Sequence, residues 1–315
     1  MQLTIDTAAA HLRAATLALV GEGQGVRFGI AVSGGPDSMA LLHLVALAFP
    51  GQAEAITVDH GLRLASADEA AMVARWCDAH AIPHATRHPE TPLTGNVQDW
   101  ARTQRYALIE QWRTTRGIDW IMTAHHADDQ LETLLMRLNR GAGVAGLAGV
   151  RARTGHIIRP LLGFRKAQLL AIAQAEALPY VDDPSNADPR FDRAALRTAL
   201  SEVDWLNPLA ASRSAAALAE ADAALEWSVA DLAAHHVTRT EDGYTLTRTD
   251  VPREYLRRLL LHMLTQADSA APPPRGDTID RAIALAMAGR QSSIGAWLLR
   301  GGPVWTLRPA PARRA

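Results

Sequence analysis

The sequence predicts an α/β fold: a doubly wound, mainly parallel sheet followed by a smaller, mainly helical C-terminal domain. Short apolar segments alternate with longer amphipathic ones as far as Asn139. Strands separated by helices pair in parallel, because parallel neighbours need a crossover connection. From about Asn207 the chain is rich in alanine and reads as helices. We therefore expect an α/β catalytic domain over residues 1–205 and an accessory domain over residues 206–315.

Four strands and four helices are predicted in alternation before Gly141. The strands are 26–32, 53–58, 83–88 and 120–124, and the helices are 38–49, 65–80, 96–116 and 128–139. The third strand is polar enough to lie at an edge, whereas the helix 65–80 gathers its apolar residues on one face. In an open sheet of this kind a ligand binds at the carboxyl ends of the strands.

The pattern changes after Gly141. Four glycines fall within 141–149, which indicates a tightly turned loop, and a helix is predicted over 167–177. The segment 180–189 is a polar turn. Farther on, Asp242-Gly243 indicates a hairpin, and 271–274 is an irregular break.

Composition excludes several classes of protein. The chain has 315 residues, a net charge of -1 and 48% hydrophobic residues, which excludes a disordered or collagen-like chain. No apolar run reaches the roughly 18–20 residues that cross a bilayer, so we expect no membrane partner. Cys77 is the only cysteine, which rules out an intrachain disulfide or a cysteine-held cluster and indicates a reducing cytoplasm.

A six-residue loop, Ser33-Gly34-Gly35-Pro36-Asp37-Ser38, lies between the first predicted strand and the first predicted helix. A helix start presents unpaired N–H groups and the positive end of a dipole, and glycines let an anion approach closely. Asp37 repels phosphate unless a cation intervenes, which points to Mg²⁺ between carboxylate and phosphate oxygens. The loop predicts a nucleotide site with Asp37 as the metal ligand. The alternative is a capped turn without a ligand.

The loop resembles the PP-loop of N-type ATP pyrophosphatases, which cleave ATP between the α and β phosphates. A P-loop and a dinucleotide fingerprint are both absent. Further stretches narrow the resemblance to the tRNA(Ile)-lysidine synthetase family over roughly 26–197. They are VDHGLR at 58–63, AR at 101–102, RY at 105–106, HHADDQLET at 125–133, RGAG at 140–143 and DPSN at 183–186.

This resemblance implies a Rossmann-like PP-loop ATPase fold and a ligase that uses ATP and Mg²⁺. The implied reaction joins free L-lysine to the wobble cytidine of a CAU-anticodon isoleucine tRNA through an adenylated cytidine. AMP and pyrophosphate are released. It also implies that Asp59, His60, Arg63 and His125 contribute to the nucleotide site, and it allows a homodimer.

Asp128, Asp129 and Glu132 cluster near the start of a predicted helix, at i,i+3 and i,i+4 spacings. Such like charges repel by about 0.2–0.5 kcal/mol per pair unless a cation relieves them. Lysine's ammonium, with a pKa of ~10.4, must lose a proton before it attacks. The cluster is therefore predicted to bind lysine and accept that proton. The alternative is a capping box, Asp129-x-x-Glu132, favoured by the helix dipole.

Several charged and aromatic residues allow two interpretations each, one functional and one structural. Arg102 and Arg105 are assigned by the resemblance to lysine or ATP handling, but they also fit a solvated basic face. Trp100 and Tyr106 suit base stacking or a core. His125-His126 suggests positioning of ATP or base rather than a transition-metal site, because adjacent histidines point to different sides. Arg193 and Arg197 are candidates for phosphate or anticodon contact, with Ala194 where the family usually has Asn.

The C-terminal part is the least informative. From Arg281 onward there are six arginines and no acid. Such a segment suits a polyanion such as tRNA, or is a solvated terminus. Three rivals share the loop or the charge: a tRNA thiolase, an amide-forming synthetase and a non-catalytic RNA-binding module.

Overall fold

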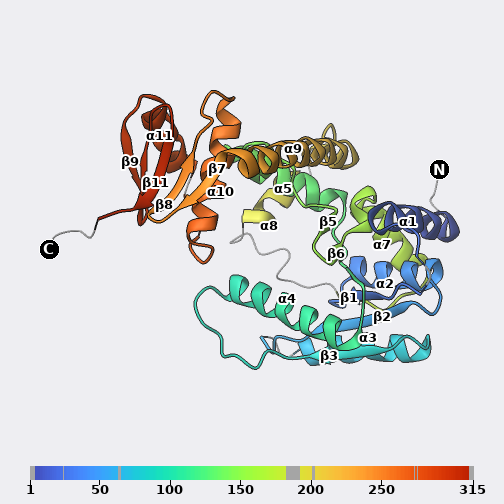
Figure 1. Ribbon diagram of the computed structural model, residues 1–315. Coiled ribbons are helices and arrows are strands. Elements are labelled where there is room, and N and C mark those ends of the chain that lie inside the picture. The colour runs from blue at the N-terminus through green and yellow to red at the C-terminus, as the bar shows by residue number, and fades with distance from the viewer. Residues whose placement is uncertain are drawn as a thin grey trace. The chain divides into compact units, whose positions relative to one another are not determined.

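The computed structural model describes residues 4–23, 25–62, 65–181, 192–200, 203–272, 274 and 276–311 (Figure 1). The chain forms two compact units, Met1–Ala219 and Glu220–Ala315. The division falls inside helix α9 (Pro208–His236), which begins just after the predicted boundary at 205/206. Among the described residues, no helix is both long and apolar enough to cross a bilayer.

The first unit contains a six-stranded sheet with the order β3-β2-β1-β4-β6-β5. All neighbours pair in parallel except β5 and β6, which form an antiparallel hairpin. The doubly wound α/β prediction is thereby confirmed, with each of the four predicted strands present. Strand bounds are β1 Phe28–Ala31, β2 Ala53–Val58, β3 His84–Arg87, β4 Trp120–Met122, β5 Arg153–Thr154 and β6 Ile157–Ile158.

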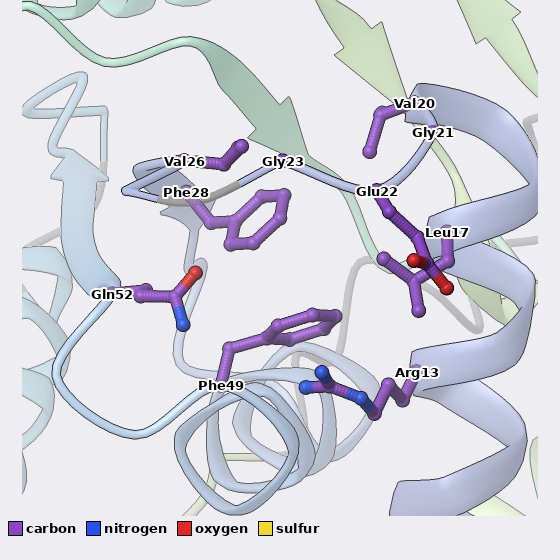
Figure 2. Close-up of a pocket in the computed structure, with 10 residues that line it drawn as sticks. All are labelled: Arg13, Leu17, Val20, Gly21, Glu22, Gly23, Val26, Phe28, Phe49 and Gln52. Carbon is purple, nitrogen blue, oxygen red and sulfur yellow. The ribbon is translucent and has the colours of Figure 1, made fainter.

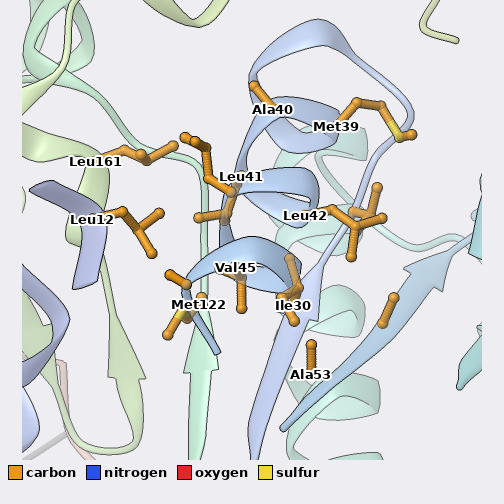
Figure 3. Packing of buried hydrophobic residues seen from close by; sticks show 14 of the residues in the cluster. Leu12, Ile30, Met39, Ala40, Leu41, Leu42, Val45, Ala53, Met122 and Leu161 are labelled. Carbon is orange, nitrogen blue, oxygen red and sulfur yellow. The ribbon is translucent and has the colours of Figure 1, made fainter. Parts of the chain in front are cut away.

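Helices cover both faces of this sheet. Their bounds are α1 Ile5–Val20, α2 Pro36–Ala48, α3 Ser66–Ala79, α4 Val97–Arg116, α5 Ala127–Asn139, α6 Val144–Leu147, α7 Lys166–Ala175 and α8 Asp192–Leu200, with a 3₁₀ turn η1 at Pro160–Gly163. Helices α1, α2, α3 and α7 share the larger core with β1, including Leu12, Ile30 and Val45 (Figure 3). Helix α4 covers the opposite face through Ile109 and Trp112.

Gly29 in β1 shows how closely α4 packs. A Cβ on Gly29 would lie 2.6 Å from Trp112 Cζ3 and 2.7 Å from Ile121 Cδ1. The position therefore requires glycine, and the middle strand is held directly against the helix. Helix α1 was not predicted, since the predicted elements begin at residue 26.

The order of the strands locates the ligand crevice. The chain moves outward from β1 through β2 to β3, and then returns to place β4 on the other side of β1. The carboxyl ends of β1 and β4 therefore border the point where the winding direction reverses. In doubly wound sheets this switch point opens a crevice for ligands.

The second unit combines helices with a five-stranded antiparallel sheet of order β7-β8-β11-β10-β9. The predicted hairpin is confirmed, since Thr240 pairs with Gly243 in β7–β8. Its Gly243 has φ +142°, and a Cβ there would collide with the Leu307 carbonyl. The other three strands were not predicted. The elements are β7 Val237–Thr240, β8 Gly243–Leu246, α10 Arg253–Ala267, α11 Gly276–Met287, β9 Gln291–Ile294, β10 Trp297–Arg300 and β11 Trp305–Pro309.

Candidate functional site: a charged crevice at the switch point

The loop Ser33–Ser38 connects β1 to the first turn of α2. Gly35 is the N-cap of α2, and Gly34 has φ +85°, a conformation that side chains rarely adopt. The Ser33 N–H donates to Ser38 Oγ at 3.2 Å, and the Ser38 hydroxyl donates to the Gly35 carbonyl at 2.9 Å. The loop is thus a tight bend that brings unpaired helix amides to the crevice, which suits an anion.

Asp37 lies in the first turn of α2 and faces the start of α5. Its Oδ2 is 3.5 Å from Nε2 of His126. Its Oδ1 is buried and has no hydrogen-bond partner among the residues that the structure describes. A buried carboxylate oxygen without a partner is costly, so this atom suits a cation held jointly with a bound phosphate. The described residues offer no cluster of three histidine, cysteine or acidic side chains for a metal.

His126 links Asp37 to the predicted acidic cluster. It is the N-cap of α5 and forms a capping box with Asp129: the Asp129 N–H donates to His126 Nδ1 at 3.3 Å, and the His126 N–H donates to Asp129 Oδ2 at 3.1 Å. This leaves Nε2 facing Asp37. Burial lowers the pKa of His126, but Asp37 and Asp129 outweigh burial, and the net shift is upward. The capping box, His126 with Asp129, begins three residues before the Asp129-x-x-Glu132 alternative.

The three acids of the predicted cluster are each paired with an arginine. Asp128 contacts Arg165 at 3.2 Å and accepts the Lys166 N–H at 2.7 Å. Burial raises the pKa of Asp128, but the Lys166 N–H and the Arg165 guanidinium prevail and lower it. The cation that relieves the repulsion of these acids is thus supplied by the chain itself.

Glu132 has the strongest of these pairs. It is 4% exposed and receives a two-point contact from Arg197, with Nε–Oε1 at 2.5 Å and Nη2–Oε2 at 3.0 Å. Arg193 lies 3.3 Å from Glu132 Oε2, and Arg197 also lies 3.4 Å from Asp129. Ion pairs between these arginines and acids therefore connect helix α8 to helix α5. These contacts place the two predicted arginines beside the acids of α5.

A second group of predicted residues lies along β2, α4 and β4. Asp59 accepts the Gly61 N–H at 2.8 Å, and its Oδ2 is 3.6 Å from His88 Nδ1. Burial raises the pKa of Asp59, but hydrogen bonds from Ser66 and Gly61 outweigh it and the net shift is downward. His60 is next to Trp100, with ring centres 6.0 Å apart, and its Nδ1 has no partner among described residues.

His125 and the arginines of α4 complete this second group. His125 Nδ1 is 2.9 Å from Thr123 Oγ1. Burial lowers the pKa of His125 to about 4; Asp129 opposes the shift, while Arg159, Arg105 and Arg193 add to it. Arg102 and Arg105 lie 5.1 and 5.5 Å from the centre of the Tyr106 ring. His125 is therefore neutral and stands between the Asp129 carboxylate and a group of arginines.

The structure thus gathers Asp37, Asp129 and Glu132 on one side and His125 with the α4 arginines on the other. Arg63 and the turn 182–191 lie outside the described residues. Sequence reasoning missed Arg165 and Arg159, and it predicted for His126 the positioning of ATP or base but not the capping of α5. A signal existed for Arg159, because a charged residue that directly follows the apolar pair Ile157-Ile158 lies at the end of a buried strand.

A cavity of about 370 Å³ lies elsewhere in this unit, between α1 and the amino ends of β1 and β2. Figure 2 shows its lining, with Phe28 and Phe49 forming the apolar wall and Arg13, Glu22 and Gln52 at the sides. It is at the edge of the sheet opposite the charged crevice, because Phe28 begins β1. None of the predicted site residues lines it.

Comparisons with known proteins agree with the interpretation of residues 33–38 as a PP-loop. The family model of the PP-loop domain matches residues 9–203. The chain is 37% identical over 298 residues to the tRNA(Ile)-lysidine synthase of Zymomonas mobilis subsp. mobilis, which covers 91% of this chain and 90% of the relative. It is 39% identical over 316 residues to that of Novosphingobium aromaticivorans, with 95% of each chain covered.

A solved structure shares the fold. The U34-tRNA thiolase NcsA from Methanococcus maripaludis, with its [4Fe-4S] cluster, matches with a TM-score of 0.56 and 18% identity, over 69% of this chain and 80% of that one. At this identity the likeness concerns the fold. Cys77, the one cysteine of the present chain, is buried in the core.

Proposed function

The chain belongs to the tRNA(Ile)-lysidine synthase family, and from that premise we propose the reaction that its crevice performs. Membership makes the chain a ligase that uses ATP and modifies tRNA. The proposed reaction joins L-lysine to the wobble cytidine of a CAU-anticodon isoleucine tRNA. The observation that carries the proposal is the position of Asp37, whose unpartnered oxygen lies beside the phosphate-binding bend and whose other oxygen faces His126.

In the first step, the ring carbonyl oxygen of cytosine attacks the α-phosphate of ATP. The bond between that phosphorus and the bridging oxygen breaks, pyrophosphate leaves, and the base carries AMP. The amides at the start of α2 and the hydroxyls of Ser33 and Ser38 are proposed to hold the departing diphosphate. The chain lowers the barrier by positioning and by neutralising charge.

Asp37 is the residue proposed to hold Mg²⁺. Its Oδ1 fits this task because the described residues leave it buried without a donor. When bound, Mg²⁺ neutralises phosphate oxygens and takes most of its ligands from phosphate and water. His126 orients the same carboxylate through Oδ2.

In the second step, the ε-amine of lysine attacks the carbon that carries AMP, and AMP leaves with the C–O electron pair. The ammonium must first lose a proton. Asp129 is the best placed of the three acids to accept it, because it contacts His126 and through it lies next to Asp37. Asp128 and Glu132 are proposed to help bind the ammonium through carboxylates that also pair with Arg165, Arg193 and Arg197.

The remaining predicted residues have supporting roles in this proposal. Arg102 and Arg105 are proposed to attract anionic groups, and Asp59, His60, Arg63 and His125 to border the nucleotide or the flipped base. The second unit, with its arginine-rich end, is proposed to bind tRNA. A cytoplasmic location and a homodimer belong to the same proposal.

The test is to incubate the full chain with ATP, Mg²⁺, lysine and a CAU-anticodon isoleucine tRNA, and then to weigh the nucleosides by mass spectrometry. Lysidine is the expected product, with tRNA-dependent release of pyrophosphate that Asp37→Ala abolishes. A thiolated nucleoside would indicate the thiolase, and turnover without tRNA would indicate an amide-forming synthetase. Binding of tRNA without any product would indicate a non-catalytic module.

A further inference from the structure

Arg159 is a buried arginine that immediately follows β6. It is 8% exposed. Its Nη1 donates to the Arg151 carbonyl at 2.7 Å and to Thr154 Oγ1 at 3.2 Å. Its guanidinium also interacts with the Tyr106 hydroxyl, whereas its Nε is buried and has no hydrogen-bond partner. Arg159 forms no ion pair with a carboxylate among the residues that the structure describes. A buried guanidinium without a counter-ion is costly, which suggests that a bound anion completes the site.

The neighbourhood of Arg159 has the positive charge that an anion needs. Burial lowers the pKa of Arg159, Tyr106 opposes the shift, and Arg102 adds to it. Arg102 and Arg105 both lie close to the Tyr106 ring. The neighbouring imidazole of His125 is neutral at physiological pH, so it does not compete for the anion. Arg102, Arg105 and Arg159 therefore lie close to the Tyr106 side chain. Asp129 is the one carboxylate that raises the pKa of the neighbouring His125.

The position of Arg159 separates it from the phosphate-binding bend. Strand β6 pairs with β4, and β4 pairs with β1, so β6 is two strands away from the Ser33–Ser38 loop. At about 4.8 Å between neighbouring strands, this is roughly 10 Å. The Thr123 N–H donates to the Ile158 carbonyl at 3.2 Å, which brings Arg159 level with the residues that lead to His125. Arg159 therefore borders the crevice but not the cradle of the diphosphate.

We infer that Arg159 binds the α-carboxylate of the amino-acid substrate, so that the ε-amine extends toward the acids at the start of α5. The inference rests on the proposed function, which supplies lysine as that substrate. A carboxylate suits the planar fork of arginine, which can donate two parallel hydrogen bonds. The anion must be small, because a guanidinium that is 8% exposed is out of reach of a phosphate within a tRNA strand. A nucleotide phosphate is the other source of anionic oxygens.

The experiment compares lysine with cadaverine, which is lysine without its carboxylate. Lysine-dependent and cadaverine-dependent modification of adenylated tRNA are measured with the full chain and with Arg159→Gln. The wild-type protein is expected to prefer lysine. In Arg159→Gln the KM for lysine should rise by about 10- to 100-fold, the range for one charged hydrogen-bond pair, while the constants for cadaverine stay unchanged. The preference for lysine should then disappear.

Two variants guard against a merely structural effect. Arg153→Gln is the matched control, because Arg153 belongs to the same hairpin but stacks on Trp120 at 4.4 Å and is exposed. It should leave both amines unaffected. Arg159→Lys keeps the charge without the fork, so it should restore part of the preference. Should Arg159→Gln fail to fold, Arg159→Lys alone must still raise the KM for lysine more than that for cadaverine.

Three results would overturn the inference. One is an equal loss for lysine and cadaverine, which would indicate a structural role. Another is a raised KM for ATP in lysine-independent pyrophosphate release, which would assign Arg159 to a nucleotide phosphate. The third is an unchanged preference for lysine. Failure of the proposed function is distinct from all of these, because then the wild-type protein would make no lysidine at all.

Discussion

Arg258 in the second unit and Arg159 in the first are equally buried, at 7% and 8% exposure, but their partners differ. Arg258 has three carboxylates: Asp222 at 2.7 Å, Glu254 at 2.9 Å and Glu226. Arg159 has only uncharged partners among the described residues: the Arg151 carbonyl and the hydroxyls of Thr154 and Tyr106. Burial lowers the pKa of both; the acids reverse the shift for Arg258, and nothing reverses it for Arg159.

This difference separates a structural charge from a functional one. A buried cation whose counter-ions come from the same unit is complete, and it joins α9 to α10. A buried cation without them is incomplete until something else binds. The acids differ in the same way in their partners: both Glu132 oxygens contact arginines of the chain, whereas Asp37 keeps an unpartnered oxygen among the described residues.

The largest effect is expected when Arg258 is replaced by leucine. The change leaves Asp222, which is 8% exposed, without its cation, and removing one partner of a buried pair costs about 3–5 kcal/mol. Glu226 and Glu254 are more exposed, so the lower end of this range is expected. Urea unfolding measures the loss. Arg253→Leu, at a half-exposed arginine of α10, is the control and should cost less than about 0.5 kcal/mol. Equal losses in the two variants would contradict the comparison.

Asp37→Asn should do the opposite, with a loss of activity and little loss of stability. Its carboxylate is incomplete without a bound cation, so tRNA-dependent pyrophosphate release should fall by at least about 100-fold, since a catalytic metal is worth several kcal/mol. Unfolding by urea should be nearly unchanged. Asp68→Asn is the matched control, because Asp68 is also in the first turn of a helix but is exposed. A large loss of stability in Asp37→Asn would assign this carboxylate to structure instead.

The elements of the sheet could be predicted from the sequence, and the pairing of charges could not. Strands such as Ala53–Val58 and helices such as Val97–Arg116 carry their own apolar pattern, which is a local property. The pairing of Glu132 with Arg197 joins residues 65 apart, and no pattern in either segment indicates the other. The acids of α5 lie at the predicted start of that helix, but their pairing with arginines was not predicted.

The strands of the second unit could not be predicted from local sequence either. Gln291–Ile294 and Trp297–Arg300 are four-residue strands that mix polar, arginine and apolar residues, so neither carries a clear alternation. Their partner is the antiparallel neighbour across Gly295. Only the Asp242-Gly243 turn carried a chemical signal of its own, because glycine tolerates the positive φ of the hairpin.

A smaller effect is expected on the titration of His125. Its pKa is lowered to about 4, mainly by burial; Arg159 and Arg105 contribute to this shift and Asp129 opposes it. The imidazole should therefore stay neutral from pH 5 upward in NMR titration of histidine-labelled protein. Because Arg159→Gln removes a nearby positive charge, the pKa of His125 should move upward. Arg153→Gln should leave it in place, and a pKa of His125 near 6.5 in the wild-type protein would contradict this electrostatic picture.

The smallest effect concerns Cys77, which shows what burial does to a group that can stay neutral. Cys77 is fully buried in the core of the first unit, and burial raises the pKa of its thiol to about 12. At pH 8 only about 10⁻⁴ of it is thiolate, so iodoacetamide should leave the native protein unmodified and alkylate it once in urea. Unlike the guanidinium of Arg159, the neutral thiol carries no charge that burial would destabilise, so it needs no ligand. Rapid alkylation of the native chain, followed by mass spectrometry, would show that the core around Cys77 opens.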